Sequence, residues 1–138
     1  MGCPEVTARY LLDTHVWLWS ILEPKRLAEP ITVRIEDGRA ELWLSPITVW
    51  EIVMLAEGGR IDIGADPVGW IEFALREFPV QDARIDRTIA AASRTVDVPH
   101  EDPADRFLAA TAGVLGLTLL THDAKLLGRS GFASIGPG

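Results

Sequence analysis

Cysteine is nearly absent from this chain of 138 residues: Cys3 is the single thiol, so no disulfide can form within the chain. A chain without disulfides fits a reducing compartment, and we expect it in the cytoplasm. Long apolar runs are also missing, because none approaches the roughly 20 residues that span a bilayer. Glu5 and Arg9 lie in the region where a signal peptide would carry its apolar segment. We therefore expect no association with a membrane.

Positive charge is scarce. The chain has 13 basic and 20 acidic residues, a formal net charge of −7, and no basic block. This balance disfavours a simple basic nucleic-acid-binding module. It does not exclude nucleic-acid binding, since two bound divalent cations would reduce the net charge to about −3.

Several catalytic signatures are lacking as well. The sequence has no glycine-rich dinucleotide fingerprint, no Walker A motif and no nucleophile elbow. Its three histidines, His15, His100 and His122, have neither cysteine partners nor the spacing of zinc-ligand pairs. His15 and His122 each adjoin an acid, and a structural role is the simpler interpretation of both. These absences leave carboxylates as the candidate chemistry.

Strands alternate with helices along the chain, which indicates a largely parallel sheet covered on both faces. The length fits one domain, residues 1–138, with residues 1–7 as a loose lead-in. Strands are expected at 9–12, 41–45, 117–121 and 132–135, with a short extended piece at 78–80; helices are expected at 14–22, 27–37, 48–58, from 66 onward, and at 86–94, 104–115 and 124–127.

Two of the expected strands lead into an acid at the start of a helix. Asp13 follows the first strand and Asp123 follows the strand at 117–121. A carboxylate at this place is either a helix cap or a site residue at the carboxyl edge of the sheet, where open α/β sheets bind ligands. We expect Thr14 to take the N-cap of the first helix.

Glu51 interrupts an almost unbroken apolar run at residues 47–55. A helix that is apolar all round is a buried one, and an unpartnered carboxylate inside it is costly. No basic residue lies three or four positions away to pair with it. Glu51 therefore either lies on a narrow solvated stripe or meets a cation.

Asp102 and Asp105 begin the helix at 104–115 and have two interpretations. Asp102 fits the cap position before Pro103, and Asp105 suits the positive N-terminal end of the helix. The same spacing directs two carboxylates into one space, where they need a counter-charge. Arg106 or a metal ion would supply it.

In a parallel sheet these acids lie at one edge. A group of four or five carboxylates without neutralising lysines forms a site of hard oxygen ligands, which suits Mg²⁺ or Mn²⁺. The neighbouring hydroxyls would hydrogen-bond the acids or their waters, and we expect this accessory role for Thr14, Ser45 and Thr121.

Four stretches in this order resemble the PIN-domain ribonucleases, and most of all the VapC toxins of bacterial toxin–antitoxin pairs. The resemblance covers residues 9 to 135, almost the whole chain. The stretches that carry it are Leu11-Leu12-Asp13-Thr14-His15, Ser45-Pro46-Ile47-Thr48-Val49-Trp50-Glu51-Ile52, Asp102-Pro103-Ala104-Asp105-Arg106-Phe107-Leu108-Ala109-Ala110-Thr111-Ala112 and Leu120-Thr121-His122-Asp123.

The resemblance implies a three-layer α/β/α sandwich around a parallel sheet of four to five strands. It implies that Asp13, Glu51, Asp105 and Asp123 are the catalytic, metal-binding acids, with Asp102 as an accessory. It further implies a VapB-like antitoxin that covers the pocket, and a homodimer. Ala104 departs from the family pattern, which usually has a bulky aromatic residue there. We also expect Arg106 to contact the substrate.

The resulting hypothesis is a toxin that cleaves RNA phosphodiesters with one or two Mg²⁺ or Mn²⁺ ions. The alternative is a non-catalytic module with a regulatory metal or phospho-acceptor pocket, as in receiver domains. Receivers begin with two adjacent acids and carry a lysine on a late strand, whereas here Asp13 stands alone and Lys125 follows the strand. A phosphatase with an aspartate nucleophile is a third possibility, but it would need an acid where His15 stands.

Overall fold

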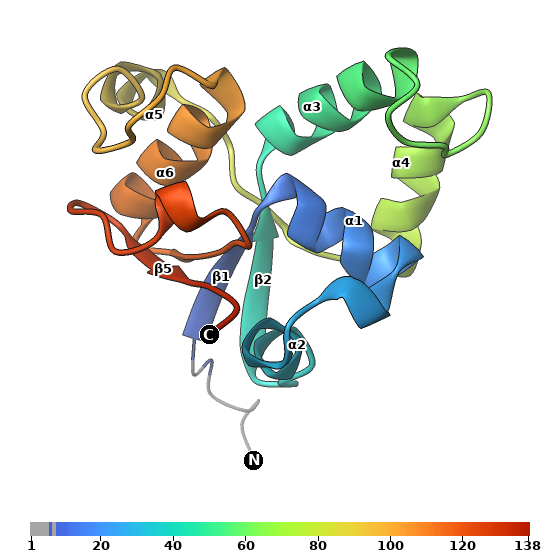
Figure 1. Ribbon diagram of the computed structural model, residues 1–138, viewed down its shortest axis with the longest axis horizontal. Helices are drawn as coiled ribbons and strands as arrows, with labels where there is room; N and C mark the ends of the chain where they lie inside the picture. Colours follow the sequence, from blue (N-terminus) through green and yellow to red (C-terminus); the bar gives the residue numbers. More distant parts are fainter. Residues whose placement is uncertain (1–5, 7) are drawn as a thin grey trace.

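The computed structural model describes residue 6 and residues 8–138 of the chain. The predicted lead-in at 1–7 therefore lies outside the described residues, apart from Val6. Five parallel strands form one sheet in the order β3-β2-β1-β4-β5, with β1 at its centre (Figure 1). Their bounds are β1 (Ala8–Leu12), β2 (Ala40–Leu44), β3 (Gln81–Asp82), β4 (Thr118–Leu120) and β5 (Ala133–Ile135).

Helices cover both faces of this sheet, with α1 to α4 on one side and α5 and α6 on the other (Figure 1). Their bounds are α1 (Thr14–Leu22), α2 (Glu29–Ile35), α3 (Pro46–Glu57), α4 (Pro67–Glu77), α5 (Arg87–Ala92) and α6 (Pro103–Leu115). Two 3₁₀ turns, η1 (Pro24–Arg26) and η2 (Ala124–Leu126), complete the elements. The predicted three-layer α/β/α sandwich is confirmed.

The two cores follow from the alternation of side chains along a strand. Leu12 of β1 packs with Trp17 of α1 and Ile52 of α3 in one apolar cluster. Its neighbour Leu11 packs on the opposite face with Leu108 of α6. The central strand is therefore buried on both faces, which is why it carries an unbroken apolar pair immediately before Asp13.

Several boundaries differ from those predicted. The N-cap of α1 is Asp13 rather than Thr14, because Asp13 keeps an extended backbone (φ −63°, ψ 155°) and Thr14 is already helical. The helix α2 is shorter than 27–37, because residues 24–26 form η1 and Ala28 is extended. The helix expected at 86–94 ends at Ala92, and the one expected at 124–127 is only the 3₁₀ turn η2. The paired residues of β3 are 81–82, just after the extended piece expected at 78–80.

Aspartates cap five of these elements, and three of those aspartates are the candidate acids Asp13, Asp102 and Asp123. Each of those three accepts a hydrogen bond from a backbone N–H of the element that follows it. Capping therefore does not exclude these acids from a site: the cap fixes each carboxylate at the carboxyl edge of the sheet. Among the described helices, none has the length and hydrophobicity needed to span a bilayer.

Candidate metal centre

The predicted acids meet in one cavity of about 340 Å³. Asp13 reaches it from the end of β1, Glu51 from α3, Asp105 from the first turn of α6, and Asp123 from the loop after β4. Among the described residues, the lining of this cavity contains no lysine or arginine. We call the cavity the acidic pocket, and its lining consists of Asp13, His15, Trp19, Glu51, Asp102, Asp105, His122 and Asp123.

Asp13 is the most deeply fixed of the acids, with 8% of its surface exposed. Its Oδ1 accepts a hydrogen bond from the Thr14 backbone N–H at 2.7 Å, and its Oδ2 accepts one from the Thr121 hydroxyl at 2.6 Å. Burial raises the pKa of Asp13, and these two hydrogen bonds act in the opposite direction. The carboxylate is thus held in one orientation by groups that favour its charged form.

Asp105 shows how unbalanced the charge of the pocket is. Burial, followed by the charges of Asp13, Asp102, Asp123 and Glu51, raises its pKa from the ordinary 3.8 to about 8. A carboxyl with such a pKa is largely protonated at neutral pH in the absence of a cation. The charge repulsion and the oxygen donors together fit Mg²⁺ or Mn²⁺, both of which prefer carboxylate ligands.

Glu51 faces the pocket from a helix that is less buried than its sequence indicated. The helix α3 exposes Trp50 and Met54, each at 46%, so its apolar sequence is not enclosed by the rest of the fold on all sides. Glu51 itself is half-buried and lines the pocket. Burial raises its pKa, a hydrogen bond with the Thr14 side chain lowers it, and the neighbouring Asp13 raises it further.

The three residues with predicted accessory hydroxyls differ in how directly they contact the acids of the pocket. Thr121 bonds Asp13 directly and accepts the Asp123 backbone N–H at 3.0 Å, so it joins two of the acids. The Thr14 side chain bonds Glu51, and its hydroxyl oxygen lies 3.3 Å from the Thr48 hydroxyl of α3, within hydrogen-bond distance. Ser45 accepts the Ile47 N–H at 3.1 Å as the cap of α3, and so it supports the helix that carries Glu51 rather than the acids themselves.

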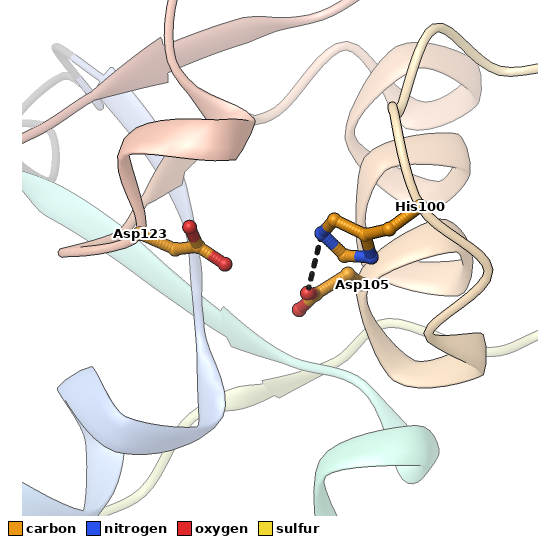
Figure 2. A group of neighbouring side chains, drawn as sticks. All are labelled: His100, Asp105 and Asp123. Carbon is orange, nitrogen blue, oxygen red and sulfur yellow. Dashed lines mark ion pairs between the residues drawn. The ribbon is translucent and has the colours of Figure 1, made fainter.

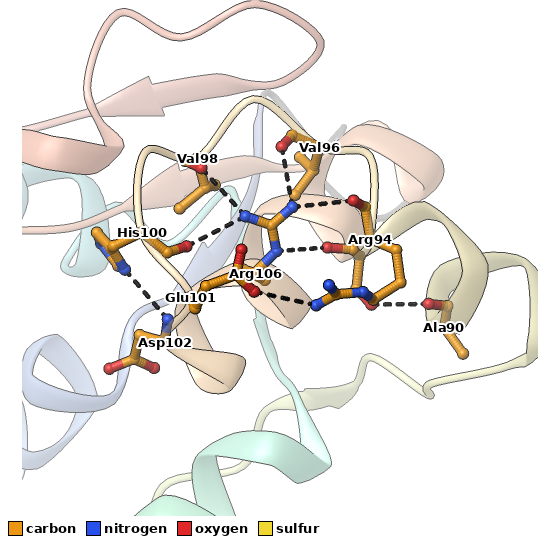
Figure 3. A network of polar contacts seen from close by, with 9 residues as sticks. Ala90, Arg94, Val96, Val98, His100, Glu101, Asp102 and Arg106 are labelled. Atoms are coloured by element: carbon orange, nitrogen blue, oxygen red, sulfur yellow. Dashed lines mark hydrogen bonds and ion pairs between the residues drawn. The ribbon is translucent and has the colours of Figure 1, made fainter.

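Arg106 has a structural role that the sequence did not indicate. It is 8% exposed, and its guanidinium donates to five backbone carbonyls, in a network that Figure 3 shows from close by. The donor–acceptor distances are 2.8 to 3.5 Å, and the acceptors are the carbonyl oxygens of Ser93, Arg94, Val96, Val98 and His100. The side chain therefore binds the loop between α5 and α6, and its contact with the substrate stays a prediction.

Sequence reasoning assigned no role to His100, which lies beside two of the acids. Its Nε2 is 3.3 Å from Asp105 Oδ2, and ligand atoms of His100, Asp105 and Asp123 all lie within 4.8 Å of one another (Figure 2). The available signal was its place in a short turn, between Pro99 and Pro103 and two residues before the Asp102 cap. That pattern indicates a fixed loop but not the direction in which the imidazole points.

The other two histidines form one wall of the pocket with Trp19. The Trp19 ring lies 5.6 Å from the His15 ring and 5.2 Å from the His122 ring, between centroids. His122 Nε2 accepts the Ala28 backbone N–H at 3.4 Å, and burial lowers the pKa of His122. Both histidines thus have packing roles, as expected, although they also border the acids.

The fold and the site together place this protein among the α/β/α sandwiches that have a carboxylate pocket at the carboxyl edge of a parallel sheet. Residues 10–130 match the PIN domain family. The chain belongs to that family. It is 34% identical over 119 residues to Ribonuclease VapC22 of Mycobacterium tuberculosis (strain ATCC 25618 / H37Rv), an alignment that covers 84% of this chain and 88% of the relative.

Solved structures show the same fold. The DNA-bound VapBC structure from Salmonella typhimurium matches with a TM-score of 0.67 and 20% identity, covering 96% of this chain and 100% of that one. The VapBC-5 structure from Mycobacterium tuberculosis, a member of the VapBC family of toxin–antitoxin systems, matches with a TM-score of 0.60 and 19% identity, covering 94% and 98%. At these identities the likeness establishes the fold alone.

Proposed function

We propose that this chain is a metal-dependent endoribonuclease and the toxin of a toxin–antitoxin pair. The observation that carries the proposal is the meeting of five carboxylates in one cavity, whose lining has no lysine or arginine in the part of the chain that the structure describes. The name of the relative, Ribonuclease VapC22, supports RNA as the substrate. The lack of a lysine in that lining also disfavours the alternative phospho-acceptor module, which would need one beside its acids.

Asp13, Glu51, Asp105 and Asp123 would hold one or two Mg²⁺ or Mn²⁺ ions, directly or through water, with Asp102 as an accessory. When bound, such a cation neutralises negative charge on a phosphodiester and makes water more acidic.

The side chains of the chain itself perform the positioning. Thr121 and the Thr14 N–H hold the Asp13 oxygens in place before any ligand arrives, so little reorganisation is needed at the moment of reaction. The aromatic rings of His15, Trp19 and His122 form one side of the pocket.

The remaining parts of the proposal concern partners and place. Two structural neighbours are VapBC structures, one of them a member of a family of toxin–antitoxin systems, which supports a VapB-like antitoxin that binds this chain and covers the pocket. We also propose a homodimer and a cytoplasmic location, where the RNA substrate is found. Co-expression with the adjacent small open reading frame, followed by purification through a tag on this chain, tests the antitoxin: a stoichiometric partner supports it and its absence counts against it.

Sequencing of RNA 5′ and 3′ ends after induced expression tests the activity. Wild-type chain is expected to create new ends at defined positions within a short time of induction, and Asp13→Asn is expected to create none. Asparagine keeps an oxygen that can cap α1, so the variant should fold, which circular dichroism checks. Identical ends in the two cultures, or no new ends with wild type, would contradict the proposed function.

A further inference from the structure

His100 has a defined partner on each ring nitrogen, although the proposed function makes no use of it. Its Nδ1 accepts the backbone N–H of Asp102 at 3.3 Å (Figure 3), and its Nε2 faces Asp105 Oδ2 at 3.3 Å (Figure 2). The side chain is 24% exposed, and the Asp105 side chain 15%. The imidazole therefore lies between the cap residue of α6 and the acid one turn into that helix.

These two contacts determine where the imidazole proton is. A nitrogen that accepts an N–H carries no proton of its own, so Nδ1 is unprotonated. The single proton of the neutral ring is then on Nε2, from which it is donated to the Asp105 carboxyl. This arrangement does not depend on whether Asp105 is charged, because both forms of a carboxyl group accept a hydrogen bond.

Arg106 fixes the position of His100 in turn. One of its N–H groups donates to the His100 carbonyl oxygen at 3.1 Å, and the same nitrogen donates to the Val98 carbonyl at 3.1 Å (Figure 3). Arg106 directly follows Asp105 in α6. The first turn of α6 therefore carries both Asp105 and Arg106. Arg106 holds the loop that contains His100, and His100 is the hydrogen-bond donor to Asp105.

We propose that His100 is a positioning residue, which holds one oxygen of Asp105 through Nε2–H and presents the carboxylate to the divalent cation of the pocket. The proposal rests on the proposed function for its cation. Carboxylates that bind metals are themselves hydrogen-bonded, and the loss of such a partner typically lowers metal affinity about 10- to 100-fold.

A direct role as a metal ligand is the competing assignment, since His100 Nε2 lies near oxygens of Asp105 and Asp123. Binding a metal through Nε2 requires that this nitrogen lose its proton. The proton would then have to move to Nδ1, which would break the hydrogen bond from the Asp102 N–H. The direction of that hydrogen bond thus favours positioning over ligation.

The first test measures the tautomer in the metal-free protein. Long-range ¹H–¹⁵N correlation spectra of ¹⁵N-histidine-labelled wild-type chain are expected to show His100 with its proton on Nε2 and none on Nδ1. A proton on Nδ1 would overturn the proposal. This measurement needs neither cleavage activity nor a variant that folds.

The second test titrates Mn²⁺ by electron paramagnetic resonance. His100→Phe is expected to weaken Mn²⁺ binding at least tenfold, whereas His100→Gln, whose amide N–H can replace Nε2–H, is expected to stay within about threefold of wild type. Arg94→Gln is the control, because its exposed side chain pairs with Glu101 in the same loop. Unchanged affinity in His100→Phe would contradict the proposal.

The third test distinguishes positioning from ligation. Electron spin echo envelope modulation spectra of the wild-type Mn²⁺ complex are expected to lack the coupling of a directly bound histidine nitrogen. A nitrogen coupling that is present in wild type and disappears in His100→Gln would overturn the proposal. If RNA is not cleaved but the tautomer and the Mn²⁺ affinities follow expectation, the proposed function fails while the role of His100 stands.

Discussion

The Thr121 hydroxyl donates a hydrogen bond of 2.6 Å to Asp13 Oδ2, across 108 residues of sequence. The two residues follow the ends of neighbouring strands, β4 and β1, and both are buried, Thr121 completely. The bond connects the acids that follow β1 and β4, since the Thr121 oxygen also accepts the Asp123 N–H. The geometry of the acidic pocket therefore depends on the register of β1 with β4.

Thr121→Val should destabilise the metal-free protein by about 1–3 kcal/mol, because it leaves a buried carboxylate oxygen without its donor. It should also raise the pKa of Asp13 further, since that hydrogen bond favours the charged form. Urea unfolding monitored by tryptophan fluorescence measures the change. Thr121→Ser keeps the hydroxyl and is the matched control; a Val variant no less stable than the Ser variant would show that the bond contributes nothing.

The metal-free protein should lose stability as the pH rises from about 4 to 8. The pKa of Asp105 is raised in the folded chain from 3.8 to about 8, so the folded state holds its proton more tightly than the unfolded state. The resulting stabilisation is complete below the unfolded pKa and disappears as the pH passes through the folded pKa. Urea unfolding in EDTA at pH 5 and pH 8.5 should show this loss in wild type and a smaller one in Asp105→Asn. Equal pH dependence of the two proteins would contradict the prediction.

Divalent cations should stabilise the chain, and Glu51→Gln should reduce that effect. A cation present at about 100 times its Kd stabilises the folded state by about 2.7 kcal/mol. Because Glu51 is half-buried among like charges, Glu51→Gln should raise the melting temperature in EDTA and shrink the increment produced by Mn²⁺. Thermal unfolding with and without Mn²⁺ measures both quantities. If Mn²⁺ raised the melting temperature of Glu51→Gln as much as that of wild type, Glu51 would not belong to the cation site.

Arg106→Leu should destabilise the fold by about 3 kcal/mol or more, because buried backbone carbonyls lose their donor. The exposed Arg94→Gln variant should change stability by no more than about 0.5 kcal/mol. Urea unfolding compares the two. If Arg106→Leu were as stable as wild type and only raised the KM for RNA, the original expectation of a substrate contact would be correct.

The acids were predictable because their signals are local. Asp13 and Asp123 follow apolar strands, and Glu51 interrupts an apolar run, so strand order alone directs them to one edge. The same local signals could not place the N-cap, because Asp13 and Thr14 are adjacent and both residue types cap helices.

Arg106 and His100 were not predictable for a different reason. The partners of Arg106 are backbone carbonyls, which every residue has, so no sequence pattern distinguishes a buried guanidinium of this kind from one that meets a phosphate. The orientation of His100 depends on the path of the loop that Arg106 holds. Such contacts follow from the tertiary fold, not from residue spacing.

Cleavage of a labelled RNA by the purified chain tests the central claim most directly. The account predicts cleavage with Mg²⁺ or Mn²⁺, none in excess EDTA, recovery when the cation is restored, and none with folded Asp13→Asn under any of these conditions. Cleavage that persists in EDTA, or that is undiminished in Asp13→Asn, would contradict the claim that the acidic pocket is a metal-dependent nuclease site.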